Sequence, residues 1–261
     1  MKIARFGTEN EFSFGIVLHQ EILVIAGDPI SEGIHLTGDT VALETALLLA
    51  PIKSPSKIIC VGMNYPAHRN EMNFAGPDHP LIFLKPSSAI VGPGEAILMP
   101  QVDGRIVHEG ELAVVIGKFA KSIPADDFQN YVFGYTIAND VSARDQMHID
   151  GQWARAKGYD TFCPIGPVIE TELSIENLNI ETFVDGEPRR QGCTAEMIHK
   201  VPELLAYISD IFTLYPGDLI LTGTPAGLGS FEAGQTIDIR IEGIGMLSNP
   251  AANANEILSA S

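Results

Sequence analysis

The sequence has few cysteines, and their arrangement argues against two kinds of small scaffold. There are three in 261 residues, Cys60, Cys163 and Cys193, and no two of them form a C-x-x-C pair. An odd number of cysteines without such pairs argues against a disulfide framework and against a zinc site. We expect three reduced and mostly buried thiols.

Basic residues are also scarce. Lysine and arginine number 16 and aspartate and glutamate 33, which gives a formal net charge of −17 at pH 7. Nucleic acids and anionic membrane surfaces both require a basic face, so we expect neither as a partner. The acidic balance identifies no substrate, because an acidic surface usually serves solubility.

Long apolar runs are missing as well. No stretch approaches the roughly 20 apolar residues of a membrane span, and the first residues, MKIARFGTENEFSFG, lack the apolar core of a signal peptide. We therefore expect a cytoplasmic protein. With 45% hydrophobic and 19% charged residues, the composition is globular and allows a sizeable core.

Short apolar segments bounded by turn residues dominate the chain, which predicts a β-rich mixed fold with few helices. Residues 1–27 indicate two or three small strands, and residues 41–51 a short helix stopped before Pro51. The stretch PIKSPSK predicts a boundary between a small N-terminal domain, 1–52, and a larger domain, 55–250. In the larger domain we expect a helix at 201–218, ended by Pro216-Gly217, and strands at 57–62, 79–86, 109–118, 131–140, 177–192 (two strands around an Asp185-Gly186 turn), 218–225 and 235–245.

Two glutamates stand at the head of a strongly apolar segment. In VHEGELAVVIG, residues 107–117, Glu109 and Glu111 are one residue apart. Side chains at i and i+2 of a strand point to the same face, so these carboxylates would project side by side, with Gly110 leaving room between them. Two like charges that close disfavour each other's ionisation unless a cation lies between them. The alternative is a solvent-exposed polar edge, which the apolar flanks weaken.

A third carboxylate, Asp140, ends the apolar segment YVFGYTIAND. With Glu109 and Glu111 it could form an all-oxygen site at the mouths of two strands. Such ligands suit the hard cations Mg²⁺, Mn²⁺ and Ca²⁺ rather than Zn²⁺. His108 would face away in a regular strand, so we do not expect it to be a ligand.

The segment GMNYPAHRNEM, residues 62–72, could carry an acid–base pair. Asn64 can cap a short helix that has Pro66 in its first turn, and His68 and Glu71 are then i, i+3 neighbours on one helical face. A carboxylate beside an imidazole orients it and raises its basicity, as a general base requires. The alternative is a surface contact on a short helix.

Two further segments could bind an anion. Lys157 lies in GQWARAKGYDTFCPIGP among aromatic residues, where it could neutralise an oxyanion, hold a carboxylate, or simply extend to solvent. The glycine-rich TGTPAGLG, residues 222–229, lacks the G-K-[ST] ending of a P-loop. Backbone and threonine contacts to a small carboxylate fit this loop better than a nucleotide does.

Taken together, these segments resemble the fumarylacetoacetate hydrolase family. The resemblance runs from about Lys57 to Pro250 and rests on GMNYPAH, FLKPSSAIVGPG, HEGELAVVIGK, NDVSARD, GQWARAKGYDTFCPIGP, PGDLILTGTPAGLG and GIGMLSNP, in the family order. It implies a β-rich catalytic domain with a rolled, barrel-like sheet, the family's C-terminal fold. It also implies a homodimer with one divalent metal ion per subunit, Mg²⁺ or Mn²⁺, with Ca²⁺ able to replace it in crystals.

The resemblance assigns roles to matching residues. It implies metal ligands at Glu109, Glu111 and Asp140, a His68–Glu71 dyad on a mobile lid from Tyr65 to about Asp78, and an active-site lysine at Lys157. Thr224 would contact substrate, and we predict substrate contacts for Gly223 and Arg144 in the same motifs. Met63 stands where many relatives have arginine.

The resemblance also implies a small 2-oxo or 2,4-dioxo carboxylate substrate and a metal-stabilised enolate. Because the His68–Glu71 pair is intact, we expect C–C bond hydrolysis of an acylpyruvate, such as fumarylpyruvate, with the dyad activating water. Oxaloacetate decarboxylation is the next alternative, and isomerisation of a 2-hydroxyhepta-2,4-diene-1,7-dioate the third. A non-catalytic Ca²⁺-binding protein is the alternative from another class, although no D-x-[DN]-x-[DN]-G loop supports it.

Overall fold

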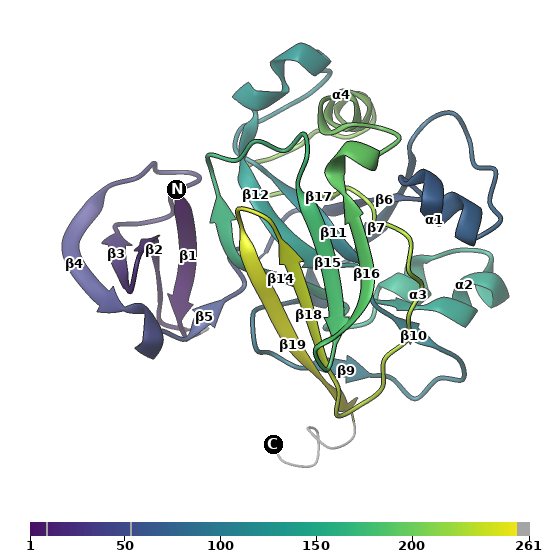
Figure 1. Cartoon of the computed structure of the whole chain (residues 1–261). Helices are drawn as coiled ribbons and strands as arrows, with labels where there is room; N and C mark the ends of the chain where they lie inside the picture. The colour runs from purple at the N-terminus through teal and green to yellow at the C-terminus, as the bar shows by residue number, and fades with distance from the viewer. Residues whose placement is uncertain (9, 53, 255–261) are drawn as a thin grey trace.

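The computed structural model describes residues 1–8, 10–52 and 54–254, and it confirms the predicted β-rich fold with few helices (Figure 1). A 12-stranded sheet has the order β4-β3-β2-β1-β14-β12-β11-β17-β6-β7, with β5 paired to β1 and β8 to β14. Its strands are β1 (Lys2–Gly7), β2 (Phe12–Leu18), β3 (Glu21–Ile25), β4 (Leu36–Ala42), β5 (Leu48–Leu49), β6 (Ile58–Gly62), β7 (Leu81–Lys85), β8 (Ile90–Val91), β11 (Gly110–Ile116), β12 (Val132–Asn139), β14 (Cys163–Glu170) and β17 (Leu219–Leu221).

A second, five-stranded sheet has the order β16-β15-β18-β19-β9. Its strands are β9 (Ile97–Met99), β15 (Asn179–Val184), β16 (Glu187–Cys193), β18 (Thr236–Ile241) and β19 (Gly245–Asn253), and the pair β10 (Ile106–Val107) and β13 (Ser142–Ala143) stands apart. The helices are α1 (Pro66–Glu71), α2 (Arg144–Asp150), α3 (Ala154–Lys157) and α4 (Val201–Ile211), and single 3₁₀ turns are present at Leu43–Thr45, Ser87–Ala89, Ala125–Asn130 and Thr194–Glu196.

Strand β11 is the centre of the core. All seven of its residues are buried, and it pairs antiparallel with β12 and β17. Leu112 and Val114 belong to the hydrophobic cluster on one side of the sheet, and Ala113 and Val115 to the cluster on the other. A strand covered on both faces is apolar throughout rather than alternating. The polar residues at its N-terminal end are therefore placed at the edge of a rigid core.

The N-terminal strands form a distinct lobe that still belongs to the large sheet. Figure 1 shows residues 1–50 beside the main body, and β1 joins it by pairing with β14 at Lys2↔Glu170 and Ile3↔Ile169.

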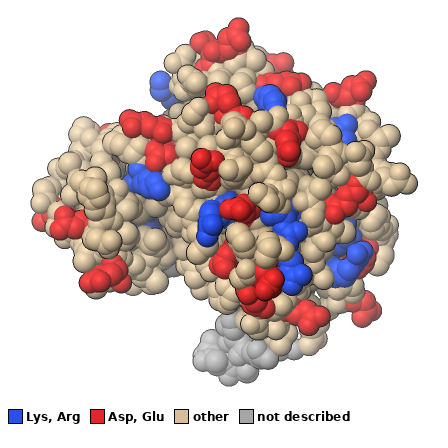
Figure 2. Space-filling model, viewed as in Figure 1, with Lys and Arg blue, Asp and Glu red and all other residues tan. Residues whose placement is uncertain are grey.

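Figure 2 shows acidic side chains dispersed over one face of the molecule with fewer basic ones between them. No helix among the described residues is long and apolar enough to cross a membrane. Cys60 and Cys163 are buried free thiols, and Cys193 is a partly exposed one.

Three local predictions are wrong. Residues 41–51 do not form a helix: Val41 pairs with Ile22 and β5 pairs with β1, because tertiary strand pairing overrides a short helical pattern. Helix α4 ends at Ile211 rather than at Pro216-Gly217. Tyr65, not Asn64, occupies the N-cap position of α1. By contrast, the Asp185-Gly186 hairpin is present as predicted, with positive φ angles of 52° and 79°.

Candidate active site

Three buried carboxylates meet at the N-terminal end of β11. Glu109, Glu111 and Asp140 each offer an oxygen, and these atoms all lie within 4.8 Å of one another. Strand geometry places the two glutamates together, and Asp140 joins them because its N–H donates to the Glu109 carbonyl oxygen at 2.9 Å. Thr182 lies against Gly110, where its Oγ1 would be 2.7 Å from an added Cβ, so only glycine fits between the glutamates.

Two buried lysines offset part of this negative charge. The Nζ of Lys157 lies 2.5 Å from Glu109 Oε2 and 2.5 Å from Asp140 Oδ2, and the Nζ of Lys85 lies 2.7 Å from Asp140 Oδ1. Burial opposes the ionisation of Glu109, but the Lys157 ammonium outweighs it and lowers the pKa of Glu109 to about 2. Lys157 is buried, so it does not extend to solvent, and it lies over the Phe83 ring.

Glu111 is the least compensated of the three acids. Its Oε2 accepts the Gly223 N–H at 2.7 Å, and among the described residues no lysine or arginine forms an ion pair with it. Burial, followed by the charges of Asp140 and Glu109, raises the pKa of Glu111 well above its ordinary value. A divalent cation among these oxygens would relieve that repulsion, and the all-oxygen donor set suits Mg²⁺, Mn²⁺ or Ca²⁺.

The predicted dyad lies on α1, which covers the triad. His68 is buried, and its Nδ1 lies 3.1 Å from Glu71 Oε2. Burial lowers the pKa of His68, so the imidazole is kept neutral. The Glu71 carboxylate also accepts the N–H groups of Gly227, at 3.2 Å, and Leu228, at 2.7 Å. The helix is thereby tied to the loop that follows β17.

The Asn64 side chain joins three segments of the chain near the site. It donates to the carbonyl oxygens of His199 and Thr222, at 3.0 and 2.8 Å, and accepts the His199 N–H at 2.8 Å. These bonds join the segment that leads into α1 to the residues that follow β17. Asn64 therefore acts as a buried brace, a role that its position before Pro66 does not reveal.

Of the three predicted substrate contacts, two line the cavity at the triad and the third, Gly223, already binds Glu111. Thr224 and Arg144 line the cavity at the triad. Arg144 donates to the thioether sulfurs of Met72, at 2.9 Å, and Met147, at 3.6 Å, which are weak acceptors that a carboxylate would outcompete. The N–H of Gly223 is already used by Glu111. In this structure Gly223 positions a candidate metal ligand.

The sequence reasoning missed two buried cations. Lys85 is the last residue of β7 and holds Asp140. Arg190 on β16 donates from Nη1 to Thr224 Oγ1 at 2.7 Å and to the Pro225 carbonyl oxygen. The other residues of β7 are partly buried or exposed, so no local pattern singles out Lys85. Nothing in the sequence places Arg190, because its partners lie in the loop that follows β17, more than 30 residues along the chain.

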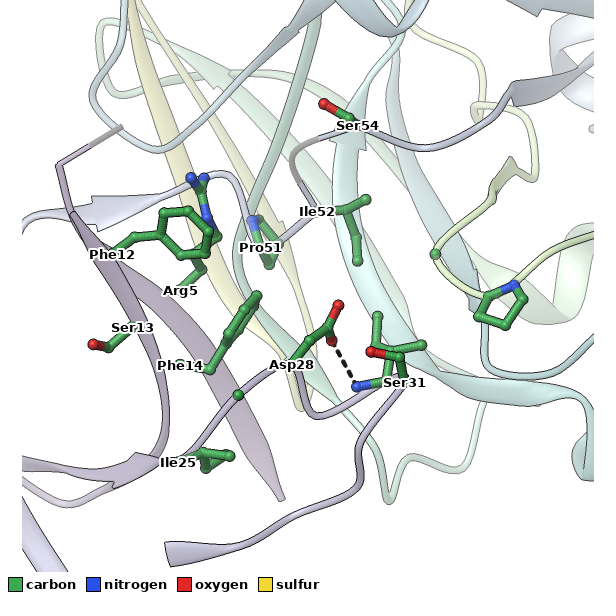
Figure 3. Close-up of a pocket in the computed structure, with 14 residues that line it drawn as sticks. Arg5, Phe12, Ser13, Phe14, Ile25, Asp28, Ser31, Pro51, Ile52 and Ser54 are labelled. Atoms are coloured by element: carbon green, nitrogen blue, oxygen red, sulfur yellow. Dashed lines mark hydrogen bonds between the residues drawn. The ribbon is translucent and has the colours of Figure 1, made fainter. Parts of the chain in front are cut away.

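The cavity at the triad is small. Its volume is about 20 Å³, which admits about one water molecule or one ion. A cavity of about 490 Å³ lies elsewhere, between the N-terminal strands and the turn before β17 (Figure 3). There Arg5 lies over the Phe12 ring, and Asp28, the one acid among the described lining residues, accepts the Ile30 N–H in a turn. The grouped carboxylates and the imidazole thus belong to the small cavity.

Comparison with known families matches this arrangement. Residues 57–252 match the family described as Fumarylacetoacetate (FAA) hydrolase C-terminal. The chain belongs to the fumarylacetoacetate hydrolase family. Residues 1–51 match a second family, described as Rv2993c-like, N-terminal. The family's members include enzymes named as hydrolases, isomerases and tautomerases.

Three relatives show the range of activities. The mitochondrial oxaloacetate tautomerase of Rattus norvegicus is 45% identical over 212 residues, 77% of this chain and 68% of that protein. The 2-hydroxyhepta-2,4-diene-1,7-dioate isomerase of Mycobacterium marinum is 43% identical, with a TM-score of 0.89 over 97% of this chain and 99% of that one. The maleylpyruvate hydrolase of Sphingobium sp. SYK-6, solved with Mn²⁺ and pyruvate, is 30% identical, with a TM-score of 0.82 over the same shares.

Proposed function

We propose that this chain is a divalent-metal-dependent enzyme that transfers a proton at C3 of a small 2-oxo carboxylate, interconverting the keto and enol forms of an oxaloacetate-type acid. The observation that carries this proposal is the buried His68 imidazole, held by Glu71 in the wall of the cavity that contains the three carboxylates. Relatives named as a tautomerase and an isomerase, at 45% and 43% identity, support the same chemistry. Their names favour proton transfer over the C–C hydrolysis that the sequence alone favoured.

His68 would be the proton carrier. Its Nδ1 is engaged by Glu71, so Nε2 is the nitrogen left to carry the proton. It would take the proton from C3 of the keto form and pass it to the 2-oxo oxygen, and would move it in the opposite direction during ketonisation. Burial keeps the imidazole neutral, the form that a general base needs. Glu71 would stabilise the transient imidazolium, because its carboxylate lies within hydrogen-bonding distance of Nδ1.

Glu109, Glu111 and Asp140 would hold a divalent ion, Mg²⁺ or Mn²⁺. When bound, that ion supplies Lewis-acid chemistry at the 2-oxo group. Lys157 holds a positive charge beside the same carboxylates and would offset the negative charge that develops on the 2-oxo oxygen. Arg144 would exchange its thioether partners for the substrate's C1 carboxylate.

Hydrolysis of an acylpyruvate is the second candidate. The same His68 could take a proton from water instead of from carbon, and the relative named maleylpyruvate hydrolase supports this alternative. Decarboxylation of oxaloacetate needs no base, so it gives no reason for the dyad. A structural calcium site would leave His68, Glu71 and Lys157 without a role.

A panel of substrates tests the proposal. The Mg²⁺- and Mn²⁺-loaded protein is mixed with enol oxaloacetate, with fumarylpyruvate and with keto oxaloacetate, and ketonisation, pyruvate release and CO₂ release are measured in parallel. We expect ketonisation to be the fastest reaction. Brisk pyruvate release from fumarylpyruvate without ketonisation would favour the hydrolase instead, and CO₂ release alone would favour the decarboxylase.

A further inference from the structure

Arg190 is a buried arginine with one edge in use and one edge free. It is 3% exposed, and its Nη1 donates to Thr224 Oγ1 and to the Pro225 carbonyl oxygen. Its Nε and Nη2 are buried and have no hydrogen-bond partner among the described residues. These two nitrogens form the fork that binds a carboxylate through two parallel hydrogen bonds. Leaving a buried charged donor pair unpaired is costly, so this edge is suited to an acceptor from outside the chain.

The guanidinium is joined to the wall of the cavity at the triad by one hydrogen bond. Its hydroxyl partner, Thr224, lines that cavity together with His68 and Glu109. Among the neighbouring acids, Glu109 has the largest effect on the pKa of Arg190. After burial, the Arg190 charge is the main cause that lowers the pKa of His68. Arg190 is therefore within electrostatic range of both the triad and α1.

The acids near Arg190 already have other partners. Glu71 binds His68 and the Gly227 and Leu228 N–H groups, Glu109 binds Lys157, and Glu111 accepts the Gly223 N–H. The Arg190 fork is thus left without a carboxylate of the protein among the described residues. A ligand could supply one.

The charge balance of the site points to the same kind of ligand. Four carboxylates, from Glu71, Glu109, Glu111 and Asp140, face four basic side chains, from Lys85, Arg144, Lys157 and Arg190. With all four carboxylates ionised, as ligation of a divalent ion requires, these charges cancel, and the ion would leave two positive charges in excess. A dianion neutralises that excess, whereas a monoanion leaves one charge buried without a partner, which is unfavourable.

We propose that Arg190 binds the second, distal carboxylate of the substrate and so makes the site selective for 2-oxo dicarboxylates over 2-oxo monocarboxylates. Arg144 would hold the C1 carboxylate and Arg190 the other end. The assignment rests on the proposed function, since it takes the 2-oxo acid to lie at the triad. The competing interpretation is that Arg190 only positions Thr224.

A matched pair of substrates separates these two roles. Enol oxaloacetate and its 4-methyl ester share one skeleton and differ in the distal charge, and their ketonisation is followed with Mg²⁺-loaded wild type, Arg190→Gln and Arg190→Lys. Arg189→Gln is the control, because Arg189 is the exposed neighbour on the same strand. The quantity compared is the ratio of kcat/KM for the acid to kcat/KM for the ester.

We expect Arg190→Gln to lower this ratio by about 10- to 100-fold, the scale of a charge-assisted bidentate contact. The loss should lie mainly in KM for the acid, with the ester changed less than about threefold, and Arg189→Gln should resemble wild type. Arg190→Lys keeps the charge without the fork, so it should recover part of the ratio; if the glutamine variant does not fold, the lysine variant alone should show a reduced ratio. An equal loss for acid and ester would overturn the proposal and leave Arg190 a positioning residue.

The same variants distinguish failure of this inference from failure of the proposed function. If the wild type ketonises neither compound, the proposed function fails. Calorimetric binding of the acid and the ester to the Mg²⁺-loaded proteins then decides the role of Arg190 by itself. Tighter binding of the acid that is lost in Arg190→Gln supports the assignment, and equal binding of both compounds to wild type contradicts it.

Discussion

The Nδ1 of His68 lies 3.1 Å from the Oε2 of Glu71, one helical turn away on the same face of α1. This contact fixes the ring and leaves Nε2 as the nitrogen for proton transfer. Because a positioned base contributes about 10²- to 10⁴-fold to a rate, His68→Asn should lower kcat for ketonisation by at least about 100-fold. Metal affinity, measured by calorimetry, should not change. Full activity in this variant would remove His68 from the mechanism.

Activity should depend on pH through His68. Burial holds its pKa below the ordinary value of 6.5, so the neutral base persists above that pH, and kcat/KM should fall only as the pH drops through the lowered pKa. The hydrogen bond and charge of Glu71 raise this pKa, so Glu71→Gln should move the acid limb to lower pH. Arg190 lowers it, so Arg190→Gln should move the limb to higher pH. If the acid limbs of the pH profiles coincide in wild type, Glu71→Gln and Arg190→Gln, this assignment is contradicted.

Metal binding should depend on Glu111, although its carboxylate has no basic partner among the described residues. Loss of a residue that merely orients a ligand costs about 10- to 100-fold in metal affinity, so loss of a ligand should cost at least that much. Glu111→Gln should therefore bind Mn²⁺ about 100-fold or more weakly in a calorimetric titration. The circular dichroism spectrum should not change. Glu187→Gln, an exposed substitution on β16, serves as the control, and equal Mn²⁺ affinity in all three proteins would exclude Glu111 as a ligand.

The segment from Tyr65 to about Asp78 should move during turnover. The cavity under α1 has room for an ion but not for a four-carbon acid, so substrate entry requires α1 to lift and the Glu71 contacts with Gly227 and Leu228 to break. Once bound, oxalate and Mg²⁺ should hold this segment closed, so its amide hydrogen exchange should slow when both are added. Identical exchange with and without oxalate would show that substrate enters by another route.

Two contacts that the sequence located correctly join residues that are close in the chain. Strand periodicity put Glu109 and Glu111 on one face, and helical spacing joined His68 to Glu71. Lys85 and Arg190 were missed because each reaches the site across a strand or sheet contact that no local pattern encodes. The predicted helix at 41–51 failed for the same reason, since β4 and β5 exist only through their pairing with β3 and β1.

The most direct test of the account is the ketonisation of enol oxaloacetate by wild type before and after removal of the metal. We predict catalysis with Mg²⁺ or Mn²⁺, its loss after treatment with a chelator, and its recovery when either ion is added back. His68→Asn should remain inactive with the metal present, since both the ion and the base are required. Ketonisation that proceeds equally well in the chelator-treated protein would contradict the central claim that the three carboxylates form the metal site of this enzyme.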